Sequence, residues 1–207
     1  DWVDYIVPQV YWNIGHQSAD YAELTHWWGK HTPQKKAQLY IGQHAARTMD
    51  GGQLEEKLAL SRRNSSGNSW WSGEDLVKNY KGLGDSLITS YQTYRALLPE
   101  VHGALGKTKA PAAISLILED TNEDGHMILW DDYREPSDPE TAFYYAVYAF
   151  PEGTRPDISD VRYLMSISTN PYFILPSMER GTTFRYMVTA INRFWQESKP
   201  ASIRISY

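Results

Sequence analysis

The sequence has 207 residues, a formal net charge of −5 and no cysteine. A chain of this length accommodates one large or two small domains, and its acidic balance argues against a general nucleic-acid-binding surface or a basic membrane patch. The lack of cysteine excludes disulfides, thiolate chemistry and cysteine-ligated zinc. No run of eighteen apolar residues occurs, so we expect no membrane span.

The aromatic content is high, with eight Trp and fifteen Tyr. Many of these rings belong in a core, but the adjacent pairs Trp27-Trp28 and Trp70-Trp71 cannot both point inward from one helix or strand. The sequence starts at Asp1 without Met or a leader peptide, and strand-like sequence follows within a few residues. We therefore expect a processed protein or a piece of a longer one.

The first predicted element is a buried strand within residues 4–15. Its apolar residues run almost continuously, which is typical of a strand covered on both faces in a parallel sheet. Pro8 has no N–H to give to a strand ladder, so we expect it at a bulge or at the sheet margin. Asn13 and Gly15 predict a turn after the strand, and Ser18 is a candidate helix N-cap.

Helices and strands then alternate as far as residue 98. An apolar stripe at helical spacing predicts a helix over residues 20–31, and its members are Tyr21, Leu24, Trp27 and Trp28. We expect further strands at residues 37–43 and 67–72, and helices at 53–63 and 86–98, the last capped by Asp85 and closed by Pro99. The order βαβαβα requires right-handed crossovers and a parallel sheet. Three units cannot close a barrel of eight, so this sheet should have two open edges.

The pattern changes after a linker of small residues, Lys and Pro at residues 103–111. Short strand candidates, separated by turn signals, lie at residues 113–118, 127–130, 143–150, 172–175, 184–192 and 202–207. Strands of this length and spacing over about a hundred residues predict a small antiparallel β-sandwich.

The second half resembles a fibronectin type III domain. The resemblance is carried by Trp130, by the run Gly181–Asn192, and by Glu197-Ser198 and Pro200. These residues match a Gly-Thr turn, a corner tyrosine, alternating small apolar residues, an Asn and a Ser/Pro exit. The resemblance implies that Tyr186 is the tyrosine-corner residue and that Trp130 lies in the core.

The first half resembles the C-terminal part of the glycosyl-hydrolase-like family 10 barrel, formerly a domain of unknown function. The matching pieces are Pro8-Gln9-Val10-Tyr11-Trp12 with Gly15, Asp20-Tyr21, Trp27-Trp28, Leu39-Tyr40-Ile41-Gly42-Gln43 and Gly84-Asp85-Ser86-Leu87. The resemblance implies that residues 1–104 are the last three βα units of a (β/α)₈ barrel, followed by the sandwich at 108–207. Members of the family are bacterial, often secreted or lipid-anchored, and are associated with the cleavage of glycans, including peptidoglycan strands. We therefore expect an extracytoplasmic location, whether periplasmic, on an outer-membrane lipoprotein or secreted.

The acidic motif of that family, an Asp-Asp-Tyr at a strand end in the middle of the barrel, would lie upstream of Asp1. The stretch Trp130-Asp131-Asp132-Tyr133-Arg134-Glu135-Pro136 is similar to it. We interpret this stretch as a sandwich strand running into its loop, with a core Trp and solvated acids. A functional role for these acids is the alternative.

Chemistry in a (β/α)₈ enzyme takes place at the carboxyl ends of the strands. The predicted substrate-binding residues at these ends are Gln9, Tyr11, Trp12, Asn13, Gln43, His44 and Trp71. Rings with a polar edge suit the face of a pyranose, and the glutamines can bind hydroxyls. Strand-end packing of the rings, and glutamines that satisfy buried backbone groups, are the structural alternatives.

Glycoside hydrolysis needs two carboxyl groups about 5 to 10 Å apart. This sequence offers Glu74 or Asp75 near a strand end, and Glu74 is our candidate catalytic acid. Its alternative role is that of a solvated loop residue or helix cap. His16, His26 and His31 lack a metal-ligand spacing, so we expect no metal and no cofactor.

Three functions remain open. In the first case the chain is the C-terminal piece of a bacterial glycoside hydrolase, and it is inactive alone because most of the catalytic acids lie upstream. Alternatively, it is a non-catalytic carbohydrate-binding or adhesive module that uses Tyr11, Trp12 and Trp71. In the third case it is a structural platform that pairs with a second copy through its open barrel edges.

Overall fold

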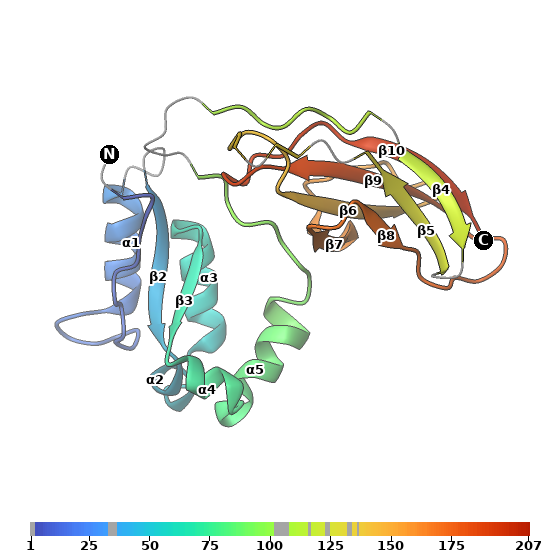
Figure 1. Ribbon diagram of the computed structural model, residues 1–207. Coiled ribbons are helices and arrows are strands. Elements are labelled where there is room, and N and C mark those ends of the chain that lie inside the picture. Colours follow the sequence, from blue (N-terminus) through green and yellow to red (C-terminus); the bar gives the residue numbers. More distant parts are fainter. Residues whose placement is uncertain are drawn as a thin grey trace. The chain divides into compact units, whose positions relative to one another are not determined.

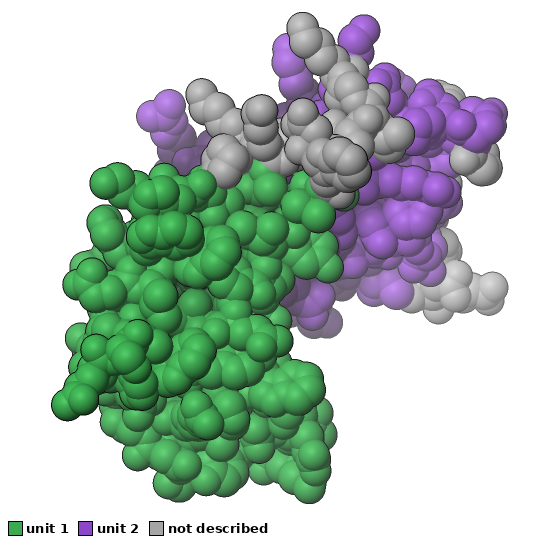
Figure 2. Space-filling model, turned by 90° about the vertical axis from the view of Figure 1, so that its left-hand side faces the viewer, with its two compact units in different colours: residues 1–93, 101–106 green, residues 94–100, 107–207 purple. Residues whose placement is uncertain are grey.

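The computed structural model describes residues 3–32, 37–101, 108–115, 117–122, 125–131, 134–135 and 137–207. The chain forms two compact units, coloured separately in Figure 2. Unit 1 holds the described residues up to Thr93, together with Val101. Unit 2 holds Tyr94–Glu100 and the described residues from Thr108 to Tyr207.

Unit 1 is built on three parallel strands in the order β1-β2-β3, shown in Figure 1. The strands are β1 (Tyr5–Ile6), β2 (Gln38–His44) and β3 (Gly67–Trp71). Helix α1 (Tyr21–His31) joins β1 to β2, whereas α2 (Ala45–Asp50) and α3 (Leu54–Asn64) join β2 to β3. After β3 follow α4 (Gly73–Val77), the 3₁₀ turn η1 (Tyr80–Gly82), α5 (Leu83–Ser86) and the π-helical turn η2 (Leu87–Tyr91). The predicted alternation of strands and helices around a parallel sheet is confirmed.

The helices α1 and α3 cover one face of this sheet. Leu39 and Ile41 of β2 are fully buried against Tyr21 of α1. The two helices approach so closely at Gly29 that a Cβ there would lie 2.7 Å from the backbone oxygen of Asn64. Alternate residues of a strand point to opposite faces, so the other face carries Tyr5, Tyr40, His44, Ser69 and Trp71.

The start of unit 1 differs from the prediction in two ways. Strand β1 has two residues instead of a long buried run, because Pro8 interrupts the ladder and only Gln9 resumes it, as an isolated bridge to Gly42. This is the marginal position that we expected of Pro8. The N-cap of α1 is Asp20, whose carboxylate accepts a hydrogen bond from the Glu23 N–H at 3.0 Å; it is not Ser18.

The helix predicted over residues 86–98 is wrong in its bounds. Left-handed backbone at Asn79, Lys81 and Gly82 breaks the chain, so α5 starts at Leu83. Asp85 therefore lies inside a helix instead of capping one, and helical winding ends at Tyr91. The short helix α2 was not predicted, because six residues show too little periodicity to stand out from a loop.

Unit 2 is a β-sandwich, as predicted. Its four-stranded sheet has the order β10-β9-β6-β7 and its three-stranded sheet the order β4-β5-β8, and all neighbouring strands are antiparallel. The strands are β4 (Ile117–Asn122), β5 (Gly125–Trp130), β6 (Tyr144–Pro151), β7 (Leu164–Ser168), β8 (Tyr172–Ile174), β9 (Thr183–Ile191) and β10 (Ala201–Ser206). The 3₁₀ turn η3 (Val161–Tyr163) precedes β7, an edge strand that the sequence did not reveal.

The core of unit 2 lies between the two sheets. Trp130 of β5 packs edge-to-face against Tyr145 of β6, with ring centroids 5.3 Å apart, so its predicted core position is confirmed. Strand β6 is buried on both faces, because Tyr148 and Phe150 belong to a second cluster on the other side of the four-stranded sheet. This explains its continuous apolar sequence. Within the Trp130–Pro136 stretch, Asp131 accepts a hydrogen bond from Ser115, whereas Asp132, Tyr133 and Pro136 lie outside the described residues.

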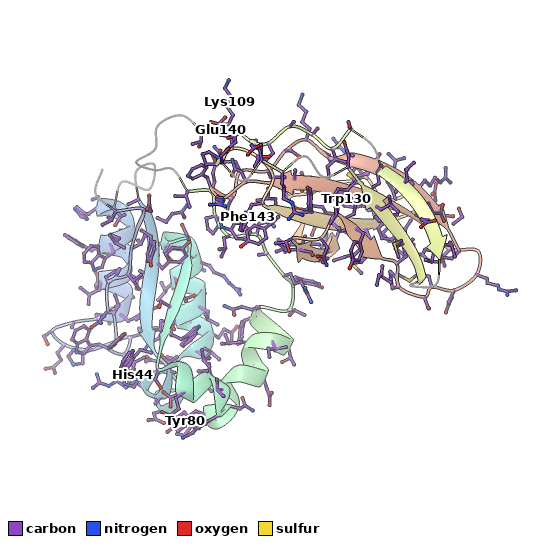
Figure 3. The ribbon with its side chains drawn as sticks, viewed as in Figure 1. His44, Tyr80, Lys109, Trp130, Glu140 and Phe143 are labelled. Atoms are coloured by element: carbon purple, nitrogen blue, oxygen red, sulfur yellow. The ribbon has the colours of Figure 1, made fainter. Side chains whose placement is uncertain are left out.

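The predicted tyrosine corner takes a different form. A corner tyrosine donates its hydroxyl to the backbone a few residues upstream. The hydroxyl of Tyr186 instead lies 2.7 Å from that of Tyr207, at the end of the chain. At the other end of the sheet, the Asn192 amide donates to the Lys109 carbonyl at 3.0 Å, and the Lys109 N–H donates to Glu140 at 3.0 Å. Figure 3 shows Lys109 and Glu140 side by side.

Within the described part of the chain, no helix is both long and apolar enough to cross a lipid bilayer.

Candidate functional site

The carboxyl ends of β2 and β3 lie at one end of the sheet, next to α2 and α4 (Figure 1). Strand β1 stops earlier, at Ile6, which stands in register with Leu39 near the start of β2. His44 is the last residue of β2 and stands in register with Trp71, the last residue of β3. Gln9 reaches the same region through its bridge to Gly42. Two of the predicted substrate-binding residues therefore end neighbouring strands here, and a third, Gln9, lies close to them in the segment after β1.

Aromatic side chains line the uncovered face here. The ring of Tyr11 meets that of His44 edge-to-face, with centroids 5.6 Å apart and planes at 85°. His44 also caps α2, because its Nδ1 accepts a hydrogen bond from the Arg47 N–H at 3.4 Å, which leaves Nε2 as the nitrogen able to bind a ligand. Trp71 is 61% exposed. Figure 3 labels His44 at the end of its strand.

The loop after β1 carries Trp12 and Asn13 and is held by helix α3. The Gln53 side chain bonds both backbone groups of Ile14, accepting from its N–H at 2.9 Å and donating to its carbonyl at 3.1 Å. The Lys57 ammonium donates to the Asn13 Oδ1 at 3.3 Å. Trp12 leans on His16 with ring centroids 6.3 Å apart and stays partly exposed. Two side chains of α3 or its cap thus fix the loop.

Gln43 does not join this aromatic surface. Its side chain is buried on the helix-covered face, where the amide nitrogen donates to the Tyr21 hydroxyl at 2.7 Å. Lys57 lies on the same face, with its ammonium 4.9 Å from the centre of the Tyr21 ring. Burial, and then the charge of Arg47, lower the pKa of Lys57 to about 8, and burial raises the pKa of Tyr21.

Glu74, the predicted catalytic acid, lies in the first turn of α4 with its side chain largely exposed, and it forms an ion pair with Lys78. Ser72 and Asp75 form a capping box, in which the Ser72 Oγ accepts from the Asp75 N–H at 3.3 Å and the Asp75 carboxylate accepts from the Ser72 N–H at 3.3 Å. Each of these two carboxylates therefore has a partner within its own helix.

A cluster that sequence reasoning missed ties the segment after β3 to α2. The Asp50 carboxylate accepts hydrogen bonds from the Lys81 ammonium at 2.6 Å and from the Tyr80 hydroxyl at 3.0 Å. The hydrogen bond from Lys81, with that from Tyr80, holds the pKa of Asp50 below its usual value. Figure 3 shows Tyr80 at this end of unit 1.

Lys57 was also missed, although a signal was present. It lies three residues after Leu54, one before Leu58 and four before Ser61, on the buried stripe of α3. A lysine in such a stripe has to find partners inside the protein. Across the described ranges, no group of three or more His, Cys, Asp or Glu side chains is arranged to hold a metal ion.

The chain is similar in sequence to glycosyl hydrolase YngK of Bacillus subtilis (strain 168). The two are 27% identical over 211 residues, which cover 95% of this chain and 40% of that protein. The chain thus spans less than half the length of this relative, and it is related to a protein named a glycosyl hydrolase. No protein-family model matches the chain.

Solved structures similar to the chain include two that cover about half of it. One is FN3tt mut, with a TM-score of 0.33, 14% identity and coverage of 47% of this chain and 97% of that chain. The other is the rat CD45 extracellular region, domains d3-d4, with a TM-score of 0.36, 12% identity and coverage of 49% and 52%.

Proposed function

We propose that this chain is part of a glycoside hydrolase and supplies three consecutive βα units of a (β/α)₈ catalytic barrel, followed by a sandwich of the fibronectin type III kind. The observation that carries the proposal is the similarity of 95% of the chain to a protein named a glycosyl hydrolase. The order and direction of β1, β2 and β3 support it, because such barrels are built from neighbouring parallel strands joined by helices. Further strands of a longer chain would pair with the two open edges.

The proposed substrate is a glycan bound at the carboxyl ends of the strands. Tyr11, His44 and Trp71 offer rings with polar edges on one uncovered face, and such rings suit the apolar face of a pyranose. The Asn13 amide and the His44 Nε2 would bind hydroxyl groups at the rim. The resemblance of the first half to a family associated with cell-wall glycans makes peptidoglycan strands the first glycan to test.

Catalysis needs a second carboxyl group besides Glu74. We place that acid, and most of the catalytic acids, in residues that precede Asp1 in the whole protein. The 207-residue stretch alone should therefore be inactive. Such an enzyme acts outside the cytoplasm, and fractionation of the source cells would test that location.

The activity test compares the whole protein with the 207-residue stretch in the release of reducing ends from peptidoglycan strands. We expect the whole protein to be active and the 207-residue stretch to be inactive. Within it, Glu74→Gln should abolish activity and Lys78→Met should retain it, because the second change removes the ion pair but keeps the carboxylate. Activity of the stretch by itself would overturn the placement of the acids, and an active Glu74→Gln enzyme would remove Glu74 from the mechanism.

A second candidate is a carbohydrate-binding module without catalysis. The ion pair of the exposed Glu74 with Lys78, together with the exposed Trp71, favours it. A glycan pull-down distinguishes the two functions when it is combined with the activity test. Tyr172, an exposed aromatic residue of unit 2, provides the control. The module is favoured if Trp71→Ala loses glycan binding, Tyr172→Ala keeps it, and the whole protein releases no reducing ends.

We also propose that two copies of the chain pair through the open edges of the three-stranded sheet. Light scattering at high protein concentration tests it, and a monomeric mass would contradict it.

A further inference from the structure

The imidazole of His44 has a structural task at one of its nitrogens and none at the other. His44 is the last residue of β2 and the N-cap of α2. Its Nδ1 accepts a hydrogen bond from the Arg47 N–H at 3.4 Å. A neutral imidazole has one accepting and one donating nitrogen, and the hydrogen bond made at one nitrogen decides which of the two carries the proton. The cap therefore places the proton on Nε2 and makes that nitrogen a hydrogen-bond donor.

The orientation of this donor is fixed from two sides. The cap holds Nδ1 at the start of α2, and the Tyr11 ring meets the imidazole edge-to-face with centroids 5.6 Å apart. Within the described part of the chain, no acceptor is hydrogen-bonded to Nε2. The Asp50 carboxylate, at the other end of α2, is bonded by Lys81 and Tyr80 instead. A donor that is already oriented loses little conformational entropy when it binds a ligand.

His44 lies where a substrate can reach it in the proposed barrel. It shares the uncovered face of the sheet with Trp71, which stands in register with it at the end of β3 and is 61% exposed. In a (β/α)₈ barrel the uncovered face becomes the interior, and the last residues of the strands line the open mouth at which substrates bind. Completion of the barrel by further strands therefore leaves this pair of side chains accessible.

A fixed donor beside an exposed indole suits an acetamido group. The carbonyl oxygen of an amide only accepts hydrogen bonds, so it matches a nitrogen that only donates. The methyl group of the acetamido substituent is apolar and would cover part of the Trp71 ring. A hydroxyl group at the same carbon of the sugar can also accept from Nε2, but it brings no apolar surface to the indole. Neighbouring strands lie about 4.8 Å apart, so one substituent can contact both side chains.

We propose that the strand-end site recognises N-acetylated sugars, with His44 donating from Nε2 to the acetamido carbonyl oxygen and Trp71 contacting the methyl group. This inference rests on the proposed function, and it narrows the glycan to one that carries 2-acetamido sugars. His44 is then a specificity-determining residue, because its Nδ1 starts α2 while its Nε2 binds the substrate.

The first measurement is the tautomer of His44 in the whole protein, labelled with ¹⁵N-histidine and kept in mildly alkaline solution. The signals of His44 are identified by their absence in His44→Asn. The ¹⁵N chemical shifts of the two ring nitrogens show which of them carries the proton, and no glycan is needed. We expect the proton on Nε2. A proton on Nδ1 would overturn the inference, whatever the glycan affinities are.

The second measurement compares two probes that differ in the substituent at C2. They are β-1,4 trisaccharides of N-acetylglucosamine and of glucose, with sulfur in place of the bridging oxygens to prevent hydrolysis. Each is titrated into the whole protein by calorimetry. We expect the N-acetylated probe to bind about tenfold or more tightly than the other, because it adds a hydrogen bond and a buried methyl group.

The outcomes distinguish this inference from the proposed function. Equal affinities for the two probes would overturn the recognition of the acetamido group and leave a glycan site at the strand ends. If neither probe bound, the proposed glycan site would be wrong, and this inference would be wrong with it.

Two variants of His44 separate the cap from the donor. His44→Asn supplies a cap oxygen at the place of Nδ1 but no donor at the place of Nε2. It should keep the melting temperature and reduce the preference for the N-acetylated probe to about threefold or less. His44→Gln carries an amide nitrogen near the place of Nε2 but is a poor N-cap, so it should keep the preference and lower the melting temperature.

The glucose trisaccharide is the internal control in both variants, because looser packing around Tyr11 would weaken the binding of both probes alike. An unchanged preference for the N-acetylated probe in His44→Asn would overturn the role of Nε2.

Discussion

At the scale of single residues, Lys57 links the packing of unit 1 to its candidate site. Its side chain is 1% exposed, and its ammonium donates to the Asn13 Oδ1 at 3.3 Å and to the Thr48 hydroxyl at 3.4 Å. Both partners are neutral, so burial lowers the pKa of Lys57 from 10.5 to about 8. A charge buried in this way costs stability. Here the ammonium contacts Asn13 in the loop after β1.

The pH dependence of stability tests this arrangement. Between pH 8 and 10.5 the unfolded chain keeps the Lys57 proton while the folded protein has lost it, so the contribution of Lys57 to stability should rise with pH across this range. The rise contributed by Lys57 has an upper limit of about 3 kcal/mol. Denaturant unfolding at pH 7.5 and pH 10 should show a smaller rise for Lys57→Met than for the wild type. Lys30→Met, on the exposed side of α1, is the control, and an identical rise in both variants would contradict the prediction.

At the scale of elements, Gly42 sets the distance between β2 and the chain after β1. Its N–H donates to the Pro8 carbonyl at 2.9 Å, and its own carbonyl accepts from the Val10 N–H at 3.0 Å. A Cβ at this position would lie 2.8 Å from the Pro8 oxygen, closer than real contacts allow. The absence of a side chain thus lets the sheet continue past Pro8 to the loop with Tyr11 and Trp12.

Gly42→Ala should therefore destabilise unit 1 and weaken glycan binding at the strand ends. The backbone at Pro8, just after β1, would have to move away, and steric overpacking of this kind costs about 1 to 3 kcal/mol. Gly73→Ala is the matched control, because no atom lies within 4 Å of a Cβ at that position. Melting temperature and glycan affinity measure the effect. If the two variants behaved alike, the close approach at Gly42 would have no energetic consequence.

At the scale of the whole molecule, each unit has hydrophobic clusters of its own. Unit 1 has one around Tyr21 and Ile41 and another around Leu58 and Leu83. The clusters of unit 2 lie on both faces of its four-stranded sheet. A domain with its own core can unfold as its own cooperative unit.

Trp130→Ala should lower the stability of unit 2 selectively. Removal of this buried ring leaves a cavity between the two sheets and costs about 3 to 5 kcal/mol. Hydrogen exchange should show faster exchange in β5, β6 and β9, with little change in β2 and α3. Leu58→Ala, in the core of unit 1, should produce the opposite pattern. Equal acceleration in both units from either variant would mean that the chain unfolds as one body.

The sequence by itself determined the order of most elements. Helical periodicity located α1 and α3, because one buried face leaves a regular pattern in each. The strands β2 and β3 were predicted as short segments between breaks in the chain. The continuous apolar run at 143–150 predicted β6, since a central strand is covered on both sides. The same local signals missed α2 and β7, which are short, and placed the helix near residue 90 wrongly, because the left-handed turn at Asn79 and Lys81 moved its start.

Only the tertiary structure decided which predicted site residues share a surface. His44 and Gln43 are adjacent in sequence, yet β-strand alternation sends His44 to Tyr11 on the uncovered face and Gln43 to Tyr21 beneath the helices. In the same way, one ring of each tryptophan pair is packed inward and the other is left at the surface. Sequence identifies the chemical groups, but which face of the sheet is buried is set by contacts between residues distant in the chain.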